Sequence, residues 1–286
     1  MPKAIAARPP KRRPKLGQHF LDSPSHALAI VDALGDISTS TVLEIGPGAG
    51  ALTSLLARRA RRLIAVELDR VLAAQLRLQF GMSRNVEILE ADILAVDFDS
   101  LLGPRPGTTS PGLDHNAAPV KVVGNLPYFI TSDILFRLFA NYRHFSELVL
   151  MVQREVADRL AAQPGGREYG LLSATAQLYG RVEKVLNVSR GAFRPPPEVD
   201  SAVLRIMIQP QFEQLGVENK PFIAFLQQSF AQKRKTLWNN LRGAYEEAAL
   251  RRALQAAEVT TSARAETLSL AQSAAVYKSL AAPSSS

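Results

Sequence analysis

Between Thr41 and Gln153 the chain alternates apolar, strand-like runs with segments of helical spacing, and this alternation restricts the fold more than any other feature. Parallel neighbouring strands need long crossover connections, usually helices, so the pattern predicts a parallel, doubly wound α/β sheet. The runs expected at the centre of this sheet are residues 41–45, 62–66, 86–89, 120–124 and 147–153. We expect a ligand to bind where the carboxyl ends of such strands meet.

The rest of the chain divides around this sheet. We expect a basic flexible arm over 1–15, an α/β domain over 16–209 with a flexible insertion at 103–119, and a helical C-terminal domain over 210–286. Ser23 and Pro24 predict a helix start, because serine is a common N-cap and proline fits the first helical position. The remaining expected elements are helices at 154–162 and 170–180, strands at 182–188 and 201–208, and several amphipathic helices within 220–280.

A glycine-rich loop follows the first central strand. Glu44 lies near the end of that strand, and Gly46, Gly48 and Gly50 follow at every second position. Glycine lets a backbone turn sharply and approach a ligand without a Cβ in the way. The spacing differs from the G-x-G-x-x-G of dinucleotide-binding folds, which places a pyrophosphate on a helix N-terminus. We therefore expect this loop to hold a small zwitterionic ligand.

Acidic residues follow the next two strands. Glu67 stands about 20 residues after the glycine loop, where an acid holds a ribose diol in related folds. Asp92 follows the run 86–89 and is expected to accept a hydrogen bond from an adenine amino group. Each acid alone is more often a helix cap or a surface charge. Together, at successive strand ends, they resemble the crevice of an S-adenosylmethionine-dependent methyltransferase.

The residues Asn125, Leu126, Pro127 and Tyr128 follow the apolar run 120–124. This combination suits the binding of a planar amine, since an amide oxygen and nearby carbonyls accept hydrogen bonds from an exocyclic NH2 while the tyrosine stacks on the attached ring. A buried strand followed by a proline turn is the alternative, and a four-residue match alone does not separate the two.

Composition excludes several kinds of protein. The 286 residues, 47% of them hydrophobic, allow one large or two modest globular domains. No apolar run of about 18 residues occurs, so we expect no membrane-spanning helix. With no cysteine and only scattered histidines, we expect no metal site. This composition fits the cytoplasm, where we expect the protein to act as a monomer.

The net charge of +8 is unevenly distributed. Every charged residue before the first acid, Asp22, is basic, and these residues form one cluster. Lys233, Arg234, Lys235 and Arg242 form a second cluster without an acid. A run of charges is often no more than a solvated face. Two acid-free clusters nevertheless favour a polyphosphate partner, for which nucleic acid is the natural candidate.

Four motifs occur in an order typical of one enzyme family. They are Gln18-His19-Phe20-Leu21, the glycine loop, the Asn125–Tyr128 motif and Phe193-Arg194-Pro195-Pro196-Pro197-Glu198-Val199-Asp200-Ser201. From about Lys15 to the C-terminal helices the chain resembles the ribosomal RNA adenine N6,N6-dimethyltransferases of the kasugamycin-sensitivity type, which act on small-subunit rRNA. One departure is His19, where that family usually carries asparagine.

The resemblance implies a Rossmann-like class I S-adenosylmethionine-dependent methyltransferase sheet with a small all-α C-terminal domain. It also implies dimethylation of N6 on two adjacent adenosines in the 3′-terminal hairpin loop of small-subunit (16S) rRNA, during ribosome biogenesis. The target base must leave its stack to reach such a site. The partner is therefore expected to be small-subunit rRNA or the immature small subunit.

The motifs assign expected roles to individual residues. The residues expected to bind S-adenosylmethionine are Gln18, His19, Leu21, Glu44, Gly46, Gly48, Gly50, Glu67, Asp92 and Asn125. The residues expected to hold the target adenine are Asn125, Leu126, Pro127, Tyr128 and, as a second stacking ring, Phe193. The expected phosphate contacts are Lys233, Arg234, Lys235 and Arg242, with the 1–15 arm in addition.

Other functions remain open at this point. The resistance enzymes that methylate large-subunit rRNA share this scaffold, and a non-catalytic RNA or DNA binder could be built on it. The complete set of motifs argues against a chain that has lost its chemistry. An NAD oxidoreductase is disfavoured, because the glycine spacing is wrong and no partner residue for hydride transfer is evident.

Overall fold

The computed structural model describes residues 19–103 and 120–281. The basic arm over 1–15 and, apart from Gly103, the insertion over 103–119 lie outside the described residues.

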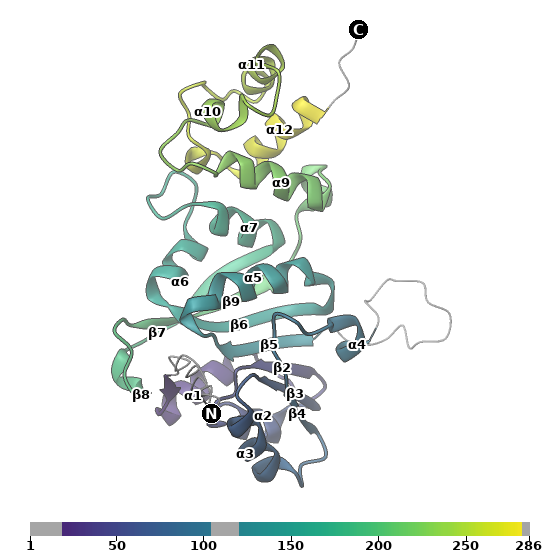
Figure 1. Cartoon of the computed structure of the whole chain (residues 1–286), viewed down its shortest axis with the longest axis vertical. Helices are drawn as coiled ribbons and strands as arrows, with labels where there is room; N and C mark the ends of the chain where they lie inside the picture. Colours follow the sequence, from purple (N-terminus) through teal and green to yellow (C-terminus); the bar gives the residue numbers. More distant parts are fainter. Residues whose placement is uncertain (1–18, 104–119, 282–286) are drawn as a thin grey trace, which may run out of the picture.

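A seven-stranded sheet forms the centre of the larger part of the molecule (Figure 1). The strands lie in the order β4-β3-β2-β5-β6-β9-β7, and β4, β3, β2, β5 and β6 are parallel. The parallel strands are β2 Thr41–Ile45, β3 Arg62–Glu67, β4 Val86–Glu90, β5 Val120–Asn125 and β6 Phe145–Gln153. Every central strand predicted from the sequence is confirmed, and β6 begins two residues earlier than expected.

The strands after β6 close the sheet in the opposite sense. β9 (Ser201–Ile208) is antiparallel to both of its neighbours, β6 and β7 (Gly180–Val188). The predicted strands at 182–188 and 201–208 are confirmed, and β7 begins two residues earlier than expected. A separate two-stranded antiparallel sheet joins β1 (Phe20–Leu21) to β8 (Phe193–Arg194). This small sheet brings two of the sequence motifs side by side.

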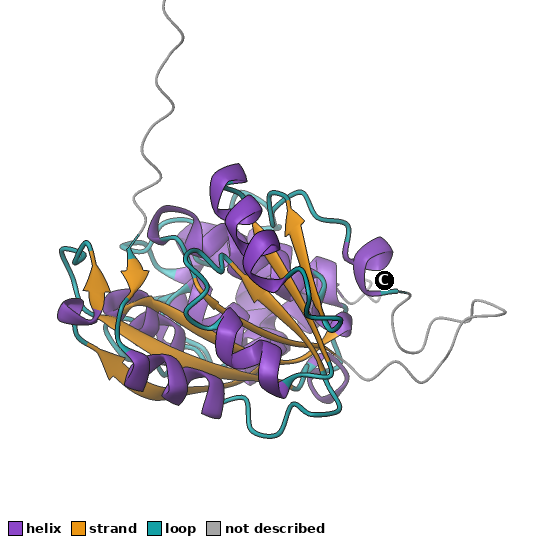
Figure 2. Cartoon of the chain, turned by 90° about the horizontal axis from the view of Figure 1, so that it is seen from below, coloured by secondary structure: helices purple, strands orange, loops and turns teal. Residues whose placement is uncertain are grey.

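Helices cover both faces of the large sheet, as Figure 2 shows. They are α1 Pro24–Asp32, α2 Thr53–Arg59, α3 Arg70–Phe80, α4 Phe98–Leu102, α5 Thr131–Ala140, α6 Arg154–Ala161 and α7 Leu171–Tyr179. Single 3-10 turns lie at Tyr128–Ile130, Tyr142–His144 and Arg190–Ala192. Successive strand residues point to opposite faces. Accordingly, Leu43 and Val122 belong to one buried core, whereas Val42 and Val123 belong to the other.

Helix α1 begins at Pro24 as predicted, but Ser23 does not cap it through its side chain. The Ser23 hydroxyl instead contacts Nδ1 of His26 at 2.7 Å. The proline therefore explains the helix start, since its fixed φ suits the first helical position and its missing N–H needs no partner there.

In the described residues beyond Ile208, the regular structure consists of helices joined by loops, with no strand. The helices are α8 Phe212–Leu215, α9 Asn219–Ser229, α10 Leu237–Leu241, α11 Glu247–Ala256 and α12 Leu270–Ala281, with a 3-10 turn at Ala265–Thr267. They enclose a third buried core, to which Leu178 on α7 and Tyr169 just before α7 also contribute. The helical C-terminal region is thus confirmed, while a domain boundary at residue 210 stays a prediction because this core includes residues on both sides of it.

A buried carboxylate ties three strands of the sheet together. Glu147 on β6 is only 2% exposed and forms ion pairs with Lys121 on β5, at 3.3 Å, and with Arg205 on β9. Lys121 is the direct register partner of Glu147. The group therefore links the parallel half of the sheet to its antiparallel edge, and removal of the carboxylate deprives two partly buried cations of their shared partner.

Replacement of Glu147 tests this link. We expect Glu147→Ala to lower the free energy of unfolding by about 3 kcal/mol, because breaking a buried ion pair leaves the charge of the partner uncompensated. Urea unfolding followed by circular dichroism measures the change. The control is Glu183→Ala, whose exposed pair with Arg181 should contribute less than about 1 kcal/mol. Equal losses in the two variants would contradict the proposed role of Glu147.

Candidate active site

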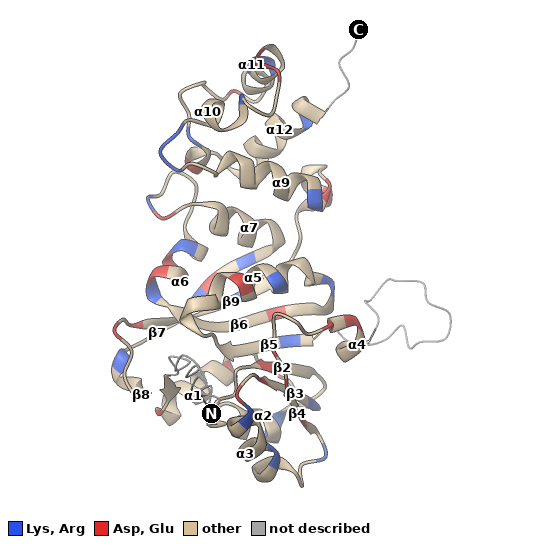
Figure 3. Cartoon of the chain, viewed as in Figure 1, with Lys and Arg blue, Asp and Glu red and all other residues tan. Residues whose placement is uncertain are grey.

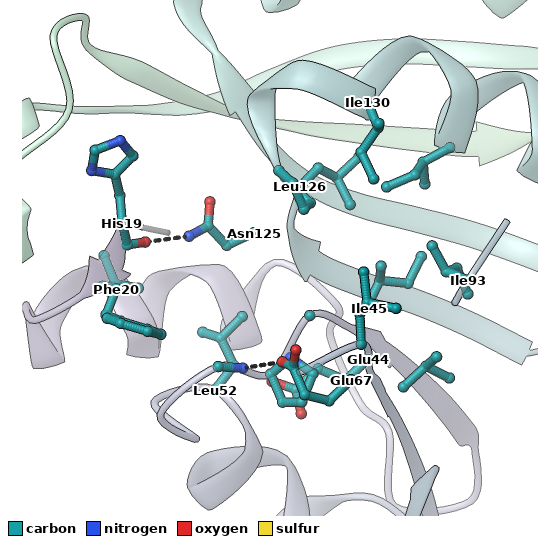
Figure 4. Close-up of a pocket in the computed structure, with 18 of the residues that line it drawn as sticks. His19, Phe20, Glu44, Ile45, Leu52, Glu67, Ile93, Asn125, Leu126 and Ile130 are labelled. Atoms are coloured by element: carbon teal, nitrogen blue, oxygen red, sulfur yellow. Dashed lines mark hydrogen bonds between the residues drawn. The ribbon is translucent and has the colours of Figure 1, made fainter. Parts of the chain in front are cut away.

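A pocket opens where β2, β3 and β5 end, next to the two-stranded β1–β8 sheet (Figure 4). Because the three strands are parallel and in register, the residues that follow them reach the same edge of the sheet. The sequence-predicted site residues that line this pocket are His19, Leu21, Glu44, Gly46, Gly48, Glu67, Asp92, Asn125, Leu126, Pro127 and Tyr128.

The glycine loop forms one wall of the pocket. Gly46 and Gly48 have φ of +64° and +58°, a left-handed conformation that side chains disfavour. A Cβ on Gly48 would stand 3.0 Å from the ring of Phe20, which lies against the loop. The loop therefore requires glycine at this position for two reasons, its backbone conformation and the close approach of Phe20.

Gly50 corrects one expectation, because it does not line the pocket. Its φ is +85°, and a Cβ there would stand 3.1 Å from Leu76 and 3.6 Å from Phe80, both on α3. The third glycine of the motif thus serves the turn into α2 and its packing against α3 rather than contact with a ligand.

Glu44 is a buried acid with an unsatisfied oxygen. It is 1% exposed, and its Oε2 has no hydrogen-bond partner among the described residues. Burial raises the pKa of the Glu44 carboxyl to about 8; neighbouring Thr53 opposes this rise, and the charge of nearby Glu67 contributes to it. A buried polar atom without a partner is costly, so a cationic or hydrogen-bonding ligand group in the pocket fits this oxygen.

Glu67 and Asp92 already accept backbone hydrogen bonds. Glu67 accepts from the N–H of Gly48 at 3.0 Å and of Asp69 at 2.9 Å, and Asp92 accepts from the N–H of Leu94 at 2.9 Å. These bonds fix each carboxylate at the rim. Since a carboxylate has about four acceptor positions, both acids keep the capacity to accept from a ligand hydroxyl or amino group.

The orientation of the Asn125 amide is fixed by the main chain of His19. Nδ2 of Asn125 donates to the His19 carbonyl at 3.0 Å, the bond drawn in Figure 4. A carbonyl oxygen only accepts, so the amide nitrogen must face it. Oδ1 is then the free atom, and among the described residues no donor reaches it. The pocket therefore presents a hydrogen-bond acceptor at the end of β5.

The residues after Asn125 hold this acceptor in place. The Leu126 N–H donates to the carbonyl of Met151 on β6 at 3.0 Å. The Pro127 carbonyl accepts from the Thr131 hydroxyl at 2.9 Å and the Ile130 N–H at 3.2 Å. The Leu126 carbonyl has no such partner in the described part of the chain. Two acceptors from neighbouring residues are thus available at one place.

Tyr128 is anchored at its hydroxyl and flanked by an imidazole. Its hydroxyl lies 2.7 Å from the hydroxyl of Ser201, the last residue of the proline-rich motif. Desolvation raises the pKa of the Tyr128 hydroxyl, so it stays neutral. The His19 ring is stacked near Tyr128, with 5.8 Å between ring centroids and 26° between planes. Nδ1 of His19 lies 2.9 Å from the Pro195 carbonyl and must carry the proton in that contact.

Phe193 corrects a second expectation. Its side chain is 0% exposed and belongs to the core beneath the β1–β8 sheet, where it is the register partner of Leu21. It does not line the pocket, and a nucleobase cannot stack on a ring that no solvent reaches. The ring that accompanies Tyr128 is His19 instead. Gln18, expected to bind the cofactor, lies outside the described residues.

Sequence reasoning missed three residues of the site. Phe20 covers the glycine loop, Ser201 anchors Tyr128, and Phe129 stands at the pocket with 64% of its surface exposed. All three belong to or adjoin motifs that were recognised. An aromatic residue in an apolar segment gives no signal of its own, because only the pairing of distant segments reveals which surface it covers.

The predicted phosphate contacts lie together on the surface of the helical region. Lys233, Arg234 and Lys235 are exposed in the loop between α9 and α10, and Arg242 is exposed directly after α10. Nζ of Lys233 donates to the carbonyl of Arg167, an exposed residue between α6 and α7 that adds to the basic surface. Figure 3 shows this basic loop on the same side of the molecule as α6, which directly follows β6.

Among residues 19–103 and 120–281, no helix is long and apolar enough to cross a membrane. In the same ranges, no group of three or more histidine, aspartate or glutamate side chains is arranged to hold a metal ion.

Comparison with known proteins decides the family. The model of the ribosomal RNA adenine dimethylase family matches residues 10–282. The chain belongs to this family. The ribosomal RNA small subunit methyltransferase A of Koribacter versatilis is 53% identical over 282 residues, covering 98% of this chain and 99% of the relative. That of Acidobacterium capsulatum is 52% identical over 277 residues, covering 96% and 94%.

Solved structures of related enzymes have the same fold. A dimethyladenosine transferase from Plasmodium falciparum superposes with a TM-score of 0.68 at 25% identity, covering 90% of this chain and 96% of that one. The 23S rRNA methyltransferase ErmE superposes with a TM-score of 0.67 at 25% identity, covering 92% and 100%. The expected Rossmann-like methyltransferase fold is thereby confirmed.

Family membership confirms the main functional expectations. This dimethylase is an rRNA adenine dimethyltransferase that uses S-adenosylmethionine. The pocket fits that cofactor, since the unpartnered Oε2 of Glu44 suits its ammonium group and the glycine wall admits a close ligand. The relatives with about half of their residues identical are named as small-subunit enzymes, whereas the likeness to the large-subunit enzyme ErmE is 25%. Methylation of small-subunit rRNA is therefore favoured over that of large-subunit rRNA. Membership of the dimethylase family also excludes an NAD oxidoreductase.

The raised pKa of Glu44 predicts how stability depends on pH. Glu44 binds its proton more tightly in the folded dimethylase than in the unfolded chain, where its pKa is 4.5. Its contribution to stability is therefore fully present below about pH 4.5 and lost as the pH rises through about 8. Cofactor-free Glu44→Gln should lose less stability than the parent protein across this range, measured as the thermal midpoint at each pH. Glu155→Gln, an exposed site on α6, is the control, and coinciding pH profiles for parent and Glu44→Gln would contradict the assignment.

Proposed function

We propose that this dimethylase transfers methyl groups to N6 of two adjacent adenosines in the 3′-terminal hairpin loop of small-subunit rRNA, two to each. We further propose that it acts as a monomer in the cytoplasm, on the immature small ribosomal subunit. The observation that carries the proposal is the orientation of the Asn125 amide, which leaves Oδ1 as an acceptor in the residue next to Leu126, and both residues line the pocket. Two adjacent acceptors match the two N–H bonds of an unmodified adenine amino group.

The cofactor is proposed to lie across the glycine wall. Glu44 would accept from its ammonium group, Glu67 from its ribose hydroxyls and Asp92 from its adenine amino group. Phe20 and Leu21 would close over it from the β1 strand. When bound, S-adenosylmethionine supplies a methyl group activated by its sulfonium charge. The ammonium of the cofactor would also favour the ionised form of Glu44, whose pKa is raised without it.

The protein contributes position and electrostatics to the transfer. An adenine amino group is a weak nucleophile, since its lone pair is delocalised into the ring. Hydrogen bonds from its N–H groups to Asn125 Oδ1 and the Leu126 carbonyl would favour a pyramidal nitrogen and stabilise the positive charge that develops on it. They would also direct the lone pair at the methyl group at near-attack distance. The nitrogen that accepts the methyl group would become positively charged and acidic, and it would release one proton to solvent, so no strong base is needed for this step.

The target adenine is proposed to stack between Tyr128 and His19. Eversion of a base costs a few kcal/mol, and stacking returns about 1–3 kcal/mol per base. An inserted base needs about 3.5 Å on each side, roughly 7 Å in total, whereas the two ring centroids are 5.8 Å apart. The His19 ring would therefore move by about 1 Å. The contact that adjusts would be its hydrogen bond to the Pro195 carbonyl, the one that its side chain forms within the described residues. Tyr128, held by Ser201, stays in place.

The basic loop is proposed to hold the RNA outside the pocket. Lys233, Arg234, Lys235 and Arg242 are exposed and would contact phosphates, with Arg167 beside them. RNA recognition of this kind reads the shape of a helix and the bases splayed from it. The 1–15 arm is proposed to add further phosphate contacts.

Methyl transfer to purified ribosomal subunits tests the function. Unmethylated small subunits and large subunits are incubated separately with labelled S-adenosylmethionine, and the modified nucleotides are then located. We expect label on two adjacent adenosines of small-subunit rRNA and none on the large subunit. Label confined to large-subunit rRNA would show that the substrate resembles that of ErmE, and label on neither would refute the proposal.

Substitution of Asn125 tests the acceptor. We expect Asn125→Ala to lower kcat by about 100-fold or more, the loss typical of one oriented electrostatic group, with cofactor affinity within a few-fold of the parent. Single-turnover methylation and titration calorimetry with S-adenosylhomocysteine measure the two quantities. Asn187→Ala, on β7 and away from the pocket, is the matched control. Normal turnover of Asn125→Ala would refute the assigned role.

Substitution of His19 separates stacking from cofactor binding. If the ring supports the base, His19→Ala should raise KM for RNA by about tenfold, while His19→Phe keeps it close to the parent value. The affinity for S-adenosylhomocysteine should not change in either variant. A loss of cofactor affinity in both variants, with KM for RNA unchanged, would instead support the expectation that His19 contacts the cofactor.

A further inference from the structure

Arginines from three segments converge at the end of the sheet opposite the pocket. Arg58 and Arg59 lie in the last turn of α2, Arg61 and Arg62 lie at the start of β3, and Arg84 precedes β4. All five are exposed. In Figure 3, Lys and Arg positions colour this end of the molecule around α2, α3, β3 and β4, far from the C-terminal helices.

Only two of these charges are neutralised. Arg59 pairs with Asp32 at 2.6 Å, and Arg62 pairs with Glu87 at 2.8 Å. Arg58, Arg61 and Arg84 have no acidic partner within the part of the chain that the structure describes. Three unpaired guanidinium groups on neighbouring segments repel one another and produce a positive potential at the surface. An anionic ligand would relieve this repulsion.

The backbone beneath these arginines is fixed rather than loose. Nδ2 of Asn85 donates to the carbonyls of Ala57 and Ala60, both at 2.9 Å, and so joins the loop before β4 to the end of α2. The Leu63 N–H donates to the Asn85 carbonyl at 2.7 Å. Arg61, Arg62, Arg84 and Asn85 line a surface depression together with Glu87, the acid paired with Arg62, and Arg58 lies outside this lining on the adjoining end of α2. Their backbone spacing is thus built into the fold, although the side-chain tips remain in solvent.

This depression cannot contact the base in the pocket. Arg62 begins β3 and Glu67 ends it, so the strand separates the depression from the cofactor side by about 17 Å. The basic loop at Lys233–Lys235 belongs to the helical region at the far end of the molecule in Figure 1. A ligand at the arginines must therefore be a different part of the substrate from the nucleotides at the pocket.

We propose that Arg58, Arg61 and Arg84 form a second RNA-binding surface, which holds the phosphate backbone of a segment of small-subunit rRNA distinct from the target hairpin. The inference rests on the proposed function, since it assumes the small subunit as substrate. Guanidinium groups bind phosphate oxygens through paired N–H donors, and they are weakly hydrated compared with ammonium groups. A folded rRNA offers phosphates at such separations, so one enzyme molecule bridges two segments and recognises their arrangement.

The test compares two substrates and two sets of variants. Arg58→Gln, Arg61→Gln and Arg84→Gln are combined in one protein, and Arg59→Gln with Arg62→Gln in another, which removes neighbouring arginines already paired with acids. Affinity for unmethylated small subunits is measured as a function of salt for the full chain. The triple variant should bind more weakly and lose up to about 2–3 units of log–log salt slope, because each of the three phosphate contacts contributes about 0.7–0.9. The paired control should change the slope little.

Methylation of an isolated hairpin separates this inference from the proposed function. A short RNA with only the target hairpin should be methylated equally by parent and triple variant, since it cannot reach the arginines. A variant with Lys233, Arg234 and Lys235 changed to glutamine serves as the comparison for loss of the basic loop. Unchanged small-subunit affinity and slope in the triple variant, or equal losses in the Arg59/Arg62 control, would overturn the second surface. Failure of the parent to methylate small subunits would refute the function itself.

Discussion

The parallel hydrogen bonding of β3, β2 and β5 is the constraint on which the site depends. Because Ile45 pairs with Val66 and with Gly124, the three strands end at one level. The glycine loop, Glu67 and Asn125 are then brought to the same edge although almost 60 residues separate Glu67 from Asn125. No contact among the side chains of the site is needed to gather them. The backbone register alone defines a crevice with a ligand-binding wall on one side and a hydrogen-bond acceptor on the other.

The β1–β8 pairing completes what the register begins. It places His19 and Phe20 over the crevice and joins them to the segment that leads to Ser201. Through this pairing, the His19 carbonyl orients Asn125 while Ser201 anchors Tyr128. The Asn125 amide and the Tyr128 ring are therefore both positioned by the segments that the small sheet joins. A change that loosens the small sheet is expected to affect both, which distinguishes it from a change at Glu44 or Asn125 alone.

The sequence predicted most of this arrangement, and its failures have physical causes. Strand positions and the pocket-lining acids were predictable because apolar periodicity and strand-end chemistry are local signals. Gly50 and Phe193 were assigned to ligands because motif membership does not say which way a residue faces. The stacking of His19 on Tyr128 depends on a pairing between residues more than 170 positions apart, which no local pattern encodes. The sequence likewise did not predict that the arginines beside β3 form one surface. The segments that carry them are joined by hydrogen bonds of Asn85 that only the folded structure reveals.

The bond from Asn125 to the carbonyl of residue 19 has a consequence for the side chain at that position. Every amino acid carries the same peptide oxygen, so the direction of the Asn125 amide does not depend on which side chain occupies position 19. The side chain at position 19, which here lies against Tyr128, can therefore change without turning the Asn125 amide. The histidine found here, where the family resemblance implies asparagine, is compatible with this orientation of the amide.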